Sequence, residues 1–161
     1  MARAREYCQD DYQQLRELAL GLYASEHPSA DPTGSDAAAF DGFLNHLLGI
    51  QAKEEGHRFV AEQDGRLLGF VCLLAPVASA GVEAGGEAYA FLSDLFVRSD
   101  SRRTGVGRLL TEKAEREARR CGAHRVALKV LAENAPARDF YREREYQERF
   151  VVMSKQLKAA E

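Results

Sequence analysis

Two arginines followed by two closely spaced glycines are the residues of this chain whose types and spacing most clearly suggest chemistry. Arg102 and Arg103 precede Gly105 and Gly107 in the stretch SDSRRTGVGRLL, residues 99–110. Glycine has no Cβ, so main-chain N–H groups can approach a ligand closely, and guanidinium groups bind phosphate oxygens through paired hydrogen bonds. The segment therefore predicts a phosphate site. The alternative interpretation is a turn that merely uses glycine, with its arginines solvated.

The sequence predicts a strand before this stretch and a helix after it. Residues 88–98, AYAFLSDLFVR, have β-type composition, and helical spacing begins near Gly105. A helix N-terminus carries unpaired N–H groups and roughly half a positive charge, which suits phosphate oxygens. Gly122 stands where such a helix would stop. The apolar face of this helix comprises Val106, Leu109, Leu110, Ala114, Ala118 and Cys121.

Several other phosphate-binding, catalytic and metal-binding motifs are absent from the sequence. The pattern G-x-x-x-x-G-K-[ST] does not occur, and the dinucleotide fingerprint fails because Leu110 stands where its third glycine belongs. No H-E-x-x-H or G-x-S-x-G motif occurs. The four histidines show no ligand spacing, and Cys8, Cys72 and Cys121 show no C-x-x-C pairing, so we expect no metal and no disulfide. Cys72 lies in an apolar strand, where we expect a buried, unreactive thiol.

Length and composition indicate a single globular domain. The chain has 161 residues, of which 45% are hydrophobic and 29% charged, enough to bury one substantial core. A net charge of -3 argues against a general nucleic-acid binder. The longest near-apolar run, residues 67–78, is shorter than the about 20 residues that a membrane-spanning helix needs. The N-terminus lacks the pattern of a secretory signal, so we expect a cytoplasmic protein that does not bind membranes.

Hydrophobic periodicity predicts the elements of the first half of the chain. Apolar residues at three- and four-residue steps indicate a helix over residues 12–27, behind the acidic caps Asp10 and Asp11. A second helix is expected from about Asp36. Two strands should flank residues 64–65, an Asp-Gly dipeptide that favours a tight hairpin.

The second half of the chain continues this alternation of elements. Residues 78–87 have the composition of a flexible loop, 124–131 that of a strand, and 146–157 a strand-like alternation. Asn134 is expected to cap a short helix with Pro136 in its first turn. The order is a strand, two helices, three strands, a helix, a strand, a helix and a strand. It indicates a mixed α/β (α+β) fold with a central sheet flanked by helices.

At two segments the chain resembles the GCN5-related N-acetyltransferases, the GNAT family. That family's acetyl-coenzyme A binding pattern, [QR]-x-x-G-x-[GA], is matched by Arg102, Gly105 and Gly107. The segment NAPARDFYREREYQE, residues 134–148, resembles the family's asparagine-containing helix with its Phe-Tyr pair. The resemblance covers about residues 5–155. It implies the GNAT-like acyl-CoA N-acyltransferase fold and one N-acetyltransferase domain made of the whole chain.

In one place the sequence departs from the family pattern. The family usually has glycine before the aromatic residue that follows this helix, and this chain has Glu145 before Tyr146. The departure raises a question about the geometry of the turn and the start of the last strand. It leaves the cofactor site untouched.

The resemblance implies a site for acetyl-coenzyme A as cosubstrate, with no metal. The pyrophosphate would be held by the main chain of residues 103–108, with Arg102 and Arg103 supplying charge. The pantetheine arm would run along the preceding strand, and Asn134 would contact it from the other side. The implied cofactor-binding residues are Leu95, Phe96, Val97, Arg102, Arg103, Thr104, Gly105, Val106, Gly107, Arg108 and Asn134.

Acetyl transfer from a thioester to an amine needs a group that accepts a proton and a group that donates one. An amine with a pKa near 10.4 is mostly protonated at pH 7, so a base or a water relay must deprotonate it. Asp94 is the candidate base, with Ser93 able to position a water; the alternative is a structural carboxylate near a strand bulge. The resemblance implies that Tyr141 protonates the departing thiolate. Its alternative is a core aromatic beside Phe140.

The acceptor amine is less well defined than the cofactor. An acidic first third of the chain favours a cationic amine, although ordinary solvated helix faces explain it equally well. Polyamines, aminoglycosides, amine metabolites and peptide amines all remain open. We expect direct attack in a ternary complex, with an acyl-CoA-binding sensor or a nucleotide-binding regulator as rival functions, and a homodimer as a possible assembly. The acidic residues are Asp10, Asp11, Glu26, Asp31, Asp36 and Asp41.

Overall fold

An antiparallel hairpin forms the centre of the structure, a computed structural model that describes residues 1–51, 56–78 and 87–156. Its strands are β2 (Gly56–Gln63) and β3 (Arg66–Val77). Between them Asp64 has a φ of 53° and Gly65 a φ of 76°. Two successive left-handed residues make the turn type that matches the twist of paired strands. The hairpin predicted from the Asp-Gly dipeptide is confirmed.

Three further strands complete a mixed sheet. They are β1 (Arg3–Glu6), β4 (Tyr89–Val97) and β5 (Val126–Leu128), and the described strands lie in the order β1-β2-β3-β4-β5. All neighbours are antiparallel except β4 and β5, which run parallel. The strand predicted over residues 124–131 is present but much shorter, because β5 pairs with β4 over only three residues.

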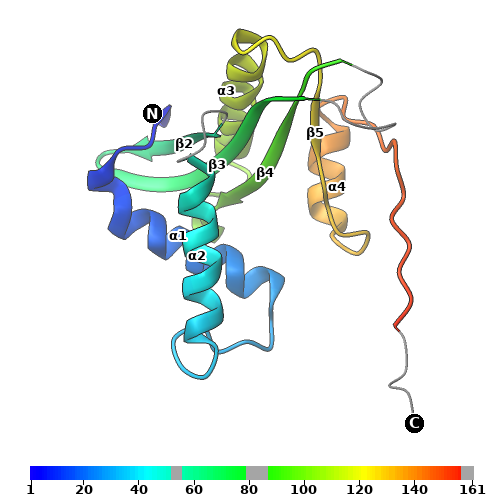
Figure 1. Ribbon diagram of the computed structural model, residues 1–161. Coiled ribbons are helices and arrows are strands. Elements are labelled where there is room, and N and C mark those ends of the chain that lie inside the picture. Colours follow the sequence, from blue (N-terminus) through cyan, green and yellow to red (C-terminus); the bar gives the residue numbers. More distant parts are fainter. Residues whose placement is uncertain (52–55, 79–86, 157–161) are drawn as a thin grey trace. The chain divides into compact units, whose positions relative to one another are not determined.

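Helices cover both faces of the sheet (Figure 1). Because β3 is central, its side chains are buried alternately on opposite faces: Phe70 and Cys72 pack toward the first two helices, and Val71 and Leu73 toward the third. The expected burial of Cys72 is confirmed, and this burial raises the pKa of its thiol to about 12, which disfavours the reactive thiolate. None of the helices in the described ranges is long and apolar enough to cross a bilayer. The helices are α1 (Tyr12–Glu26), α2 (Ala37–Gln51) and α3 (Val106–Arg120).

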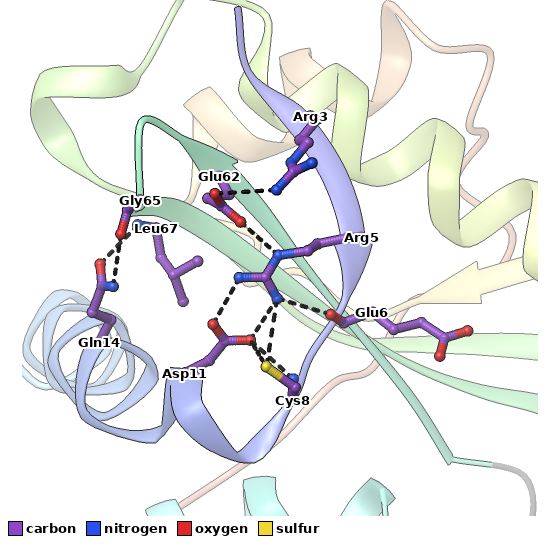
Figure 2. A network of polar contacts seen from close by, with 9 residues as sticks. All are labelled: Arg3, Arg5, Glu6, Cys8, Asp11, Gln14, Glu62, Gly65 and Leu67. Carbon is purple, nitrogen blue, oxygen red and sulfur yellow. Dashed lines mark hydrogen bonds and ion pairs between the residues drawn. The ribbon is translucent and has the colours of Figure 1, made fainter.

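Polar contacts fasten β1 and the start of α1 to the central hairpin (Figure 2). The Arg5 guanidinium donates to both carboxylate oxygens of Asp11, at 2.7 and 2.8 Å, and to Glu62 at 2.6 Å. Asp11 also accepts the N–H of Cys8 at 2.9 Å. The prediction that Asp11 caps the first helix is wrong in this respect: its side chain makes no cap hydrogen bond to α1, since the Arg5 and Cys8 donors use its carboxylate.

Two glycines allow the close packing that positions β4. A Cβ at Gly69 in β3 would lie 2.4 Å from the carbonyl oxygen of Phe96 and 3.2 Å from Leu110 of α3. A Cβ at Gly21 in α1 would lie 2.6 Å from the ring of Phe96. Both distances are shorter than van der Waals contact, so each glycine lets a neighbouring element pack directly against β4.

Residues Lys129–Glu161 form a unit separate from Met1–Leu128. Its helix α4 (Ala135–Arg142) starts as predicted, because Asn134 Oδ1 accepts the N–H of Ala137 at 3.2 Å and proline lies in the first turn. The strand predicted over residues 146–157 is wrong for the described residues, since 146–156 pair with no other strand and residues 150–153 are exposed. The loop predicted over residues 78–87 falls mainly on 79–86, outside the described ranges.

Candidate active site

The second half of β4 has a free edge. β5 pairs with β4 only from Ala90 to Leu92, whereas β3 pairs with β4 as far as Val97. In the described part of the chain, no strand borders residues 93–97 on the side of β5. Main-chain N–H and C=O groups along such an edge need partners, and an extended molecule with amide groups can supply them as another strand would.

A β-bulge interrupts β4 at Ser93. Cys72 pairs with Asp94 and the next residue of β3, Leu73, pairs with Leu92, so Ser93 is the extra residue. Bulges redirect side chains and are common beside active sites. Ser93 Oγ donates to Asp94 Oδ2 at 2.7 Å. The bulge anticipated near Asp94 is therefore present, and the half-buried carboxylate beside it still has an oxygen to offer a ligand.

The chain then makes a turn with two left-handed residues before α3. After a short 3-10 helix, Ser99–Ser101, the φ angles are 61° at Arg103 and 91° at Gly105. Thr104 Oγ1 donates to the carbonyl of Ser101 at 2.7 Å and holds the turn. Apart from the adjacent residues, no atom of the described part of the chain lies within 4 Å of where a Cβ of Gly105 would be. Glycine is therefore needed here for its backbone conformation, and the space in front of it is open.

This turn leaves a row of main-chain N–H groups without protein partners. In the residues that the structure describes, none of the N–H groups from Arg103 to Arg108 donates to another group, and the first helical bond runs from Leu109 to Gly105 at 2.9 Å. The first N–H groups of any helix lack intrahelical acceptors. Here they lie beside exposed residues, so the arrangement can bind an anion at the positive end of the helix dipole.

The arginines around the turn divide into two groups. Arg98 pairs with Glu17 at 2.8 Å, and Arg108 pairs with Glu112 at 2.7 Å, so carboxylates neutralise these two arginines. Arg102 and Arg103 are exposed and belong to none of the ion pairs among the described residues. These are the two arginines predicted to supply charge.

Arg102 is held against β4. Its Nε donates to the carbonyl oxygen of Val97 at 3.2 Å, and its guanidinium lies 5.8 Å from the centre of the Phe96 ring. The Arg102 side chain, predicted to bind phosphate, is thus hydrogen-bonded to the main-chain carbonyl of Val97, a residue predicted to contact pantetheine. Leu95 and Val97 pack toward α3, whereas Phe96 packs toward α1.

The C-terminal end of α1 brings a second carboxylate near β4. Glu26 is exposed, but desolvation by neighbouring groups raises the pKa of its carboxyl, the charge of Asp94 raises it further, and His27 opposes the shift. The sequence placed Glu26 among the acidic residues of the first helices but gave no reason to associate it with Asp94. No local spacing could have done so, because the two meet only through the packing of α1 on β4.

The remaining acidic residues of the first third have different environments. Asp11 is buried in its ion pair and is unavailable to a ligand. The carboxylate of Asp36 accepts the N–H of Asp31 at 2.7 Å, so this pair shapes the loop before α2. Asp10 and Asp41 are exposed. An acidic surface for a cationic acceptor therefore involves fewer of these residues than the sequence suggested.

Tyr141 and Asn134 belong to the second unit. The rings of Phe140 and Tyr146 lie 5.1 and 5.4 Å from the Tyr141 ring, and burial raises the pKa of the Tyr141 hydroxyl to about 12. The hydroxyl is therefore a proton donor at neutral pH. Since the carbonyl oxygen of the Asn134 side chain caps α4, only its NH₂ group remains for a ligand.

Comparisons with known proteins bear on the family and the fold of the chain. The Acetyltransferase (GNAT) family model matches residues 13–146. The fold resembles the aminoglycoside N-acetyltransferase AAC(6')-Iy in complex with CoA, with a TM-score of 0.77 and 18% identity over 99% of this chain and 96% of that one. It also resembles the aminoglycoside 6'-N-acetyltransferase AAC(6')-IG from Acinetobacter haemolyticus, with a TM-score of 0.72 and 16% identity over 97% and 99% of the two chains.

A third similar structure is a transcriptional regulator from Bacillus halodurans, with a TM-score of 0.75 and 15% identity over 98% of this chain and all of the other. No curated protein sequence matches the chain. At these identities the structural likeness shows the fold, a five-stranded mixed sheet with flanking helices. The family match spans most of the sequence, and the chain accordingly belongs to the GNAT family of acetyltransferases.

Proposed function

We propose that this protein is an acetyl-CoA-dependent N-acetyltransferase that acetylates a primary amine of a small, cationic acceptor, with residues 1–161 acting as one N-acetyltransferase domain. The observation that carries the proposal is the continuity of two features. The free edge of β4 leads directly into the turn whose N–H groups, from Arg103 to Arg108, have no partners among the described residues. A cosubstrate with an amide-containing arm and a diphosphate complements both.

In this proposal the donor is bound mainly by main-chain groups. N–H groups of Arg103, Thr104 and Gly105 and of the first turn of α3, which comprises Val106, Gly107 and Arg108, hold the diphosphate. Arg102 and Arg103 add charge-assisted hydrogen bonds. The pantetheine arm lies along Leu95, Phe96 and Val97, and the NH₂ group of Asn134 donates to it. The donor supplies an acetyl group activated as a thioester.

The acceptor must lose a proton before it attacks. Asp94, oriented by Ser93, accepts that proton directly or through a water, and the nearby Glu26 carboxyl adds negative charge that favours a cationic amine. Its raised pKa also moves Glu26 toward the range of an effective base. The neutral amine then attacks the thioester carbonyl in the ternary complex, without an acyl-enzyme.

Tyr141 assists the departure of the thiolate. A thiol has a pKa near 8.5, so complete proton transfer from a hydroxyl with a pKa of about 12 is uphill by roughly 5 kcal/mol. The hydroxyl therefore stabilises the developing thiolate chiefly as a hydrogen-bond donor. Loss of this bond should slow acetyl transfer without abolishing it, because a thiolate is a fair leaving group by itself.

The test is release of free thiol from acetyl-CoA by the purified full-length chain, measured across a panel of amines. The panel contains aminoglycosides, in view of the names of the similar structures, together with polyamines, amine metabolites and peptide amines. Thiol release that depends on the added amine, with the acetylated amine identified by mass spectrometry, supports the enzyme.

A second candidate is an acyl-CoA-binding regulatory module, for which the resemblance to a transcriptional regulator gives a specific reason. It predicts thermal stabilisation by acetyl-CoA with no turnover of any amine. Equal stabilisation by ATP would instead indicate a nucleotide-binding regulator, because ATP shares the adenosine 5'-diphosphate part of coenzyme A and lacks its pantetheine arm.

A further inference from the structure

His57, Glu117 and Cys121 gather at the end of α3 that is opposite to the phosphate-binding turn. Glu117 and Cys121 are one helical turn apart, and His57 lies near the start of β2. The potential ligand atoms of the three side chains all lie within 4.8 Å of one another. The sequence predicted no metal site because His57 is 64 positions from Cys121. Packing of α3 on β2 brings them together.

Each ring nitrogen of His57 lies near one of the other two side chains, Nδ1 near Glu117 and Nε2 at 3.6 Å from Cys121 Sγ, and one of the two tautomers leaves Nδ1 for a ligand. Its Nε2 lies 3.3 Å from the carbonyl oxygen of Ala75, to which the Nε2–H tautomer donates. In this tautomer Nδ1 carries a lone pair and faces Glu117 Oε1 at 3.5 Å. A histidine that binds a metal commonly donates its second ring N–H to a backbone carbonyl in this way. Two facing lone pairs repel each other unless a proton or a cation lies between them.

Two of the separations in the cluster are close to those around a tetrahedral cation. With metal–ligand distances of about 2.0 Å for nitrogen and oxygen and about 2.3 Å for sulfur, tetrahedral angles put N and O about 3.3 Å apart and S and O about 3.5 Å apart. Glu117 Oε1 lies 3.5 Å from His57 Nδ1 and 3.8 Å from Cys121 Sγ. Shifts of a few tenths of an ångström would bring these two distances to their tetrahedral values, and the Cys121 side chain would also adjust toward His57, since the three ligand atoms lie within 4.8 Å of one another.

Arg120 competes with a cation for the carboxylate of Glu117. The Glu117 residue is only 6% exposed, and its Oε1 accepts hydrogen bonds from Nε and Nη2 of Arg120. The Arg120 side chain is 71% exposed, so it can leave this position at small cost. Lys113, the other cation near the cluster, lies over the ring of Phe59, at 4.8 Å from its centre.

We propose that His57, Glu117 and Cys121 form a three-ligand site for a thiophilic divalent cation such as Zn²⁺. One thiolate, one imidazole and one carboxylate favour such an ion over Mg²⁺ or Ca²⁺, which prefer oxygen ligands. His57 and Cys121 are half-buried, so water can complete the coordination. The bound cation fastens the last turn of α3 to β2.

The test uses the full-length chain after treatment with a chelator and titrates it with Co²⁺. Thiolate ligation gives a near-ultraviolet charge-transfer absorption, and tetrahedral geometry gives strong visible bands. We expect one cation per chain, displacement of Co²⁺ by Zn²⁺, and a rise in Tm with Zn²⁺. Cys121→Ser should remove the charge-transfer band and weaken binding at least tenfold, whereas the matched exposed-thiol control Cys8→Ser should retain both.

Two further variants distinguish loss of cation binding from misfolding and from a purely structural role of Arg120. His57→Gln, checked for folding by circular dichroism, should weaken Co²⁺ binding as Cys121→Ser does. Arg120→Ala should strengthen binding about threefold, because it frees the Glu117 carboxylate. If the arginine only stabilises the helix end, the variant lowers Tm and leaves cation affinity unchanged. A wild-type chain that binds no more Co²⁺ than Cys121→Ser and His57→Gln would overturn the proposal.

Discussion

Glu145 ends α4 with the same left-handed backbone and the same pair of hydrogen bonds with which Gly122 ends α3. The φ angles are 65° and 80°. In each case the N–H of the left-handed residue bonds to the carbonyl three positions earlier in the chain. The N–H of the residue that follows bonds to the carbonyl five positions earlier than that following residue. This is the Schellman arrangement. Replacement of the family's usual glycine by Glu145 therefore keeps the turn, at the cost of conformational strain.

Glu145→Gly should stabilise the protein by about 1 kcal/mol, because glycine adopts a left-handed conformation without the steric penalty of a Cβ. Urea unfolding measures the difference. Glu143→Gly provides the control: Glu143 has a helical φ of -60°, so glycine there should destabilise the protein. Equal effects of the two changes would show that Glu145 is not strained.

Gly69→Ala should destabilise the protein by about 3 kcal/mol, since its methyl group would lie 2.4 Å from a backbone oxygen of β4 that cannot move independently. Gly42→Ala is the matched control. A Cβ there meets nothing within 4 Å, and alanine favours the helix, so stability should rise by about 0.5 kcal/mol. Denaturant midpoints compare the two, and a Gly69→Ala variant as stable as the wild type would contradict the close packing of β3 on β4.

Asp11→Asn should destabilise the protein by about 2 kcal/mol at pH 7, with a difference that shrinks in acid. The hydrogen bonds from Arg5 hold the pKa of the Asp11 carboxyl below its usual value. A proton then binds the unfolded chain more tightly than the folded one, so the contribution is complete above about pH 4 and is lost as pH falls through the lowered pKa. Unfolding curves between pH 2 and pH 7 measure this, with Asp10→Asn, a change at the neighbouring exposed aspartate, as the matched control.

Arg102→Ala should raise the KM for acetyl-CoA about tenfold with little change in kcat, because it removes a charge-assisted contact to phosphate. The effect should diminish at high salt. Arg116→Ala removes the same charge from an exposed position farther along α3 and should leave KM unchanged. An unchanged KM in Arg102→Ala would indicate that this arginine serves only to bind the Val97 carbonyl.

Tyr141→Phe should lower kcat about tenfold to a hundredfold with the KM values retained, through loss of a hydrogen bond to the thiolate. Since burial raises the Tyr141 pKa to about 12, any rise of activity between pH 6 and pH 9 belongs to other groups and should persist in the variant. Tyr12→Phe in α1 is the control. Full activity of Tyr141→Phe would show that Tyr141 only packs as a core aromatic residue.

The features predicted correctly from the sequence are those that depend on neighbouring residues. The hairpin at Asp64 and Gly65, the end of α3 at Gly122 and the cap of α4 at Asn134 each follow from the conformational preferences of one or two residues. The turn before α3 is local in the same sense, because its glycines and arginines lie within a few positions of one another, and its binding of phosphate stays a prediction.

The features that the sequence did not reveal depend on contacts between distant segments. Asp11 has the residue type of a helix cap, but Arg5 and Cys8 use its carboxylate. The alternation in residues 146–157 is a property of the segment alone, whereas a strand also requires a partner edge. The association of Glu26 with Asp94 likewise arises only when α1 packs on β4.

Along the free edge of β4, ligand binding and packing of the interior use different atoms. An extended molecule lying along it meets atoms common to every amino acid, so recognition there does not depend on which residues occupy positions 95–97. The side chains of those positions remain available for the interior, as Phe96 shows by resting against Gly21. Substitutions at positions 95–97 should therefore lower the stability of the fold more readily than they weaken binding of a donor. Under the proposed function, changes elsewhere in the chain would alter the choice of acceptor while binding of the donor along β4 persists.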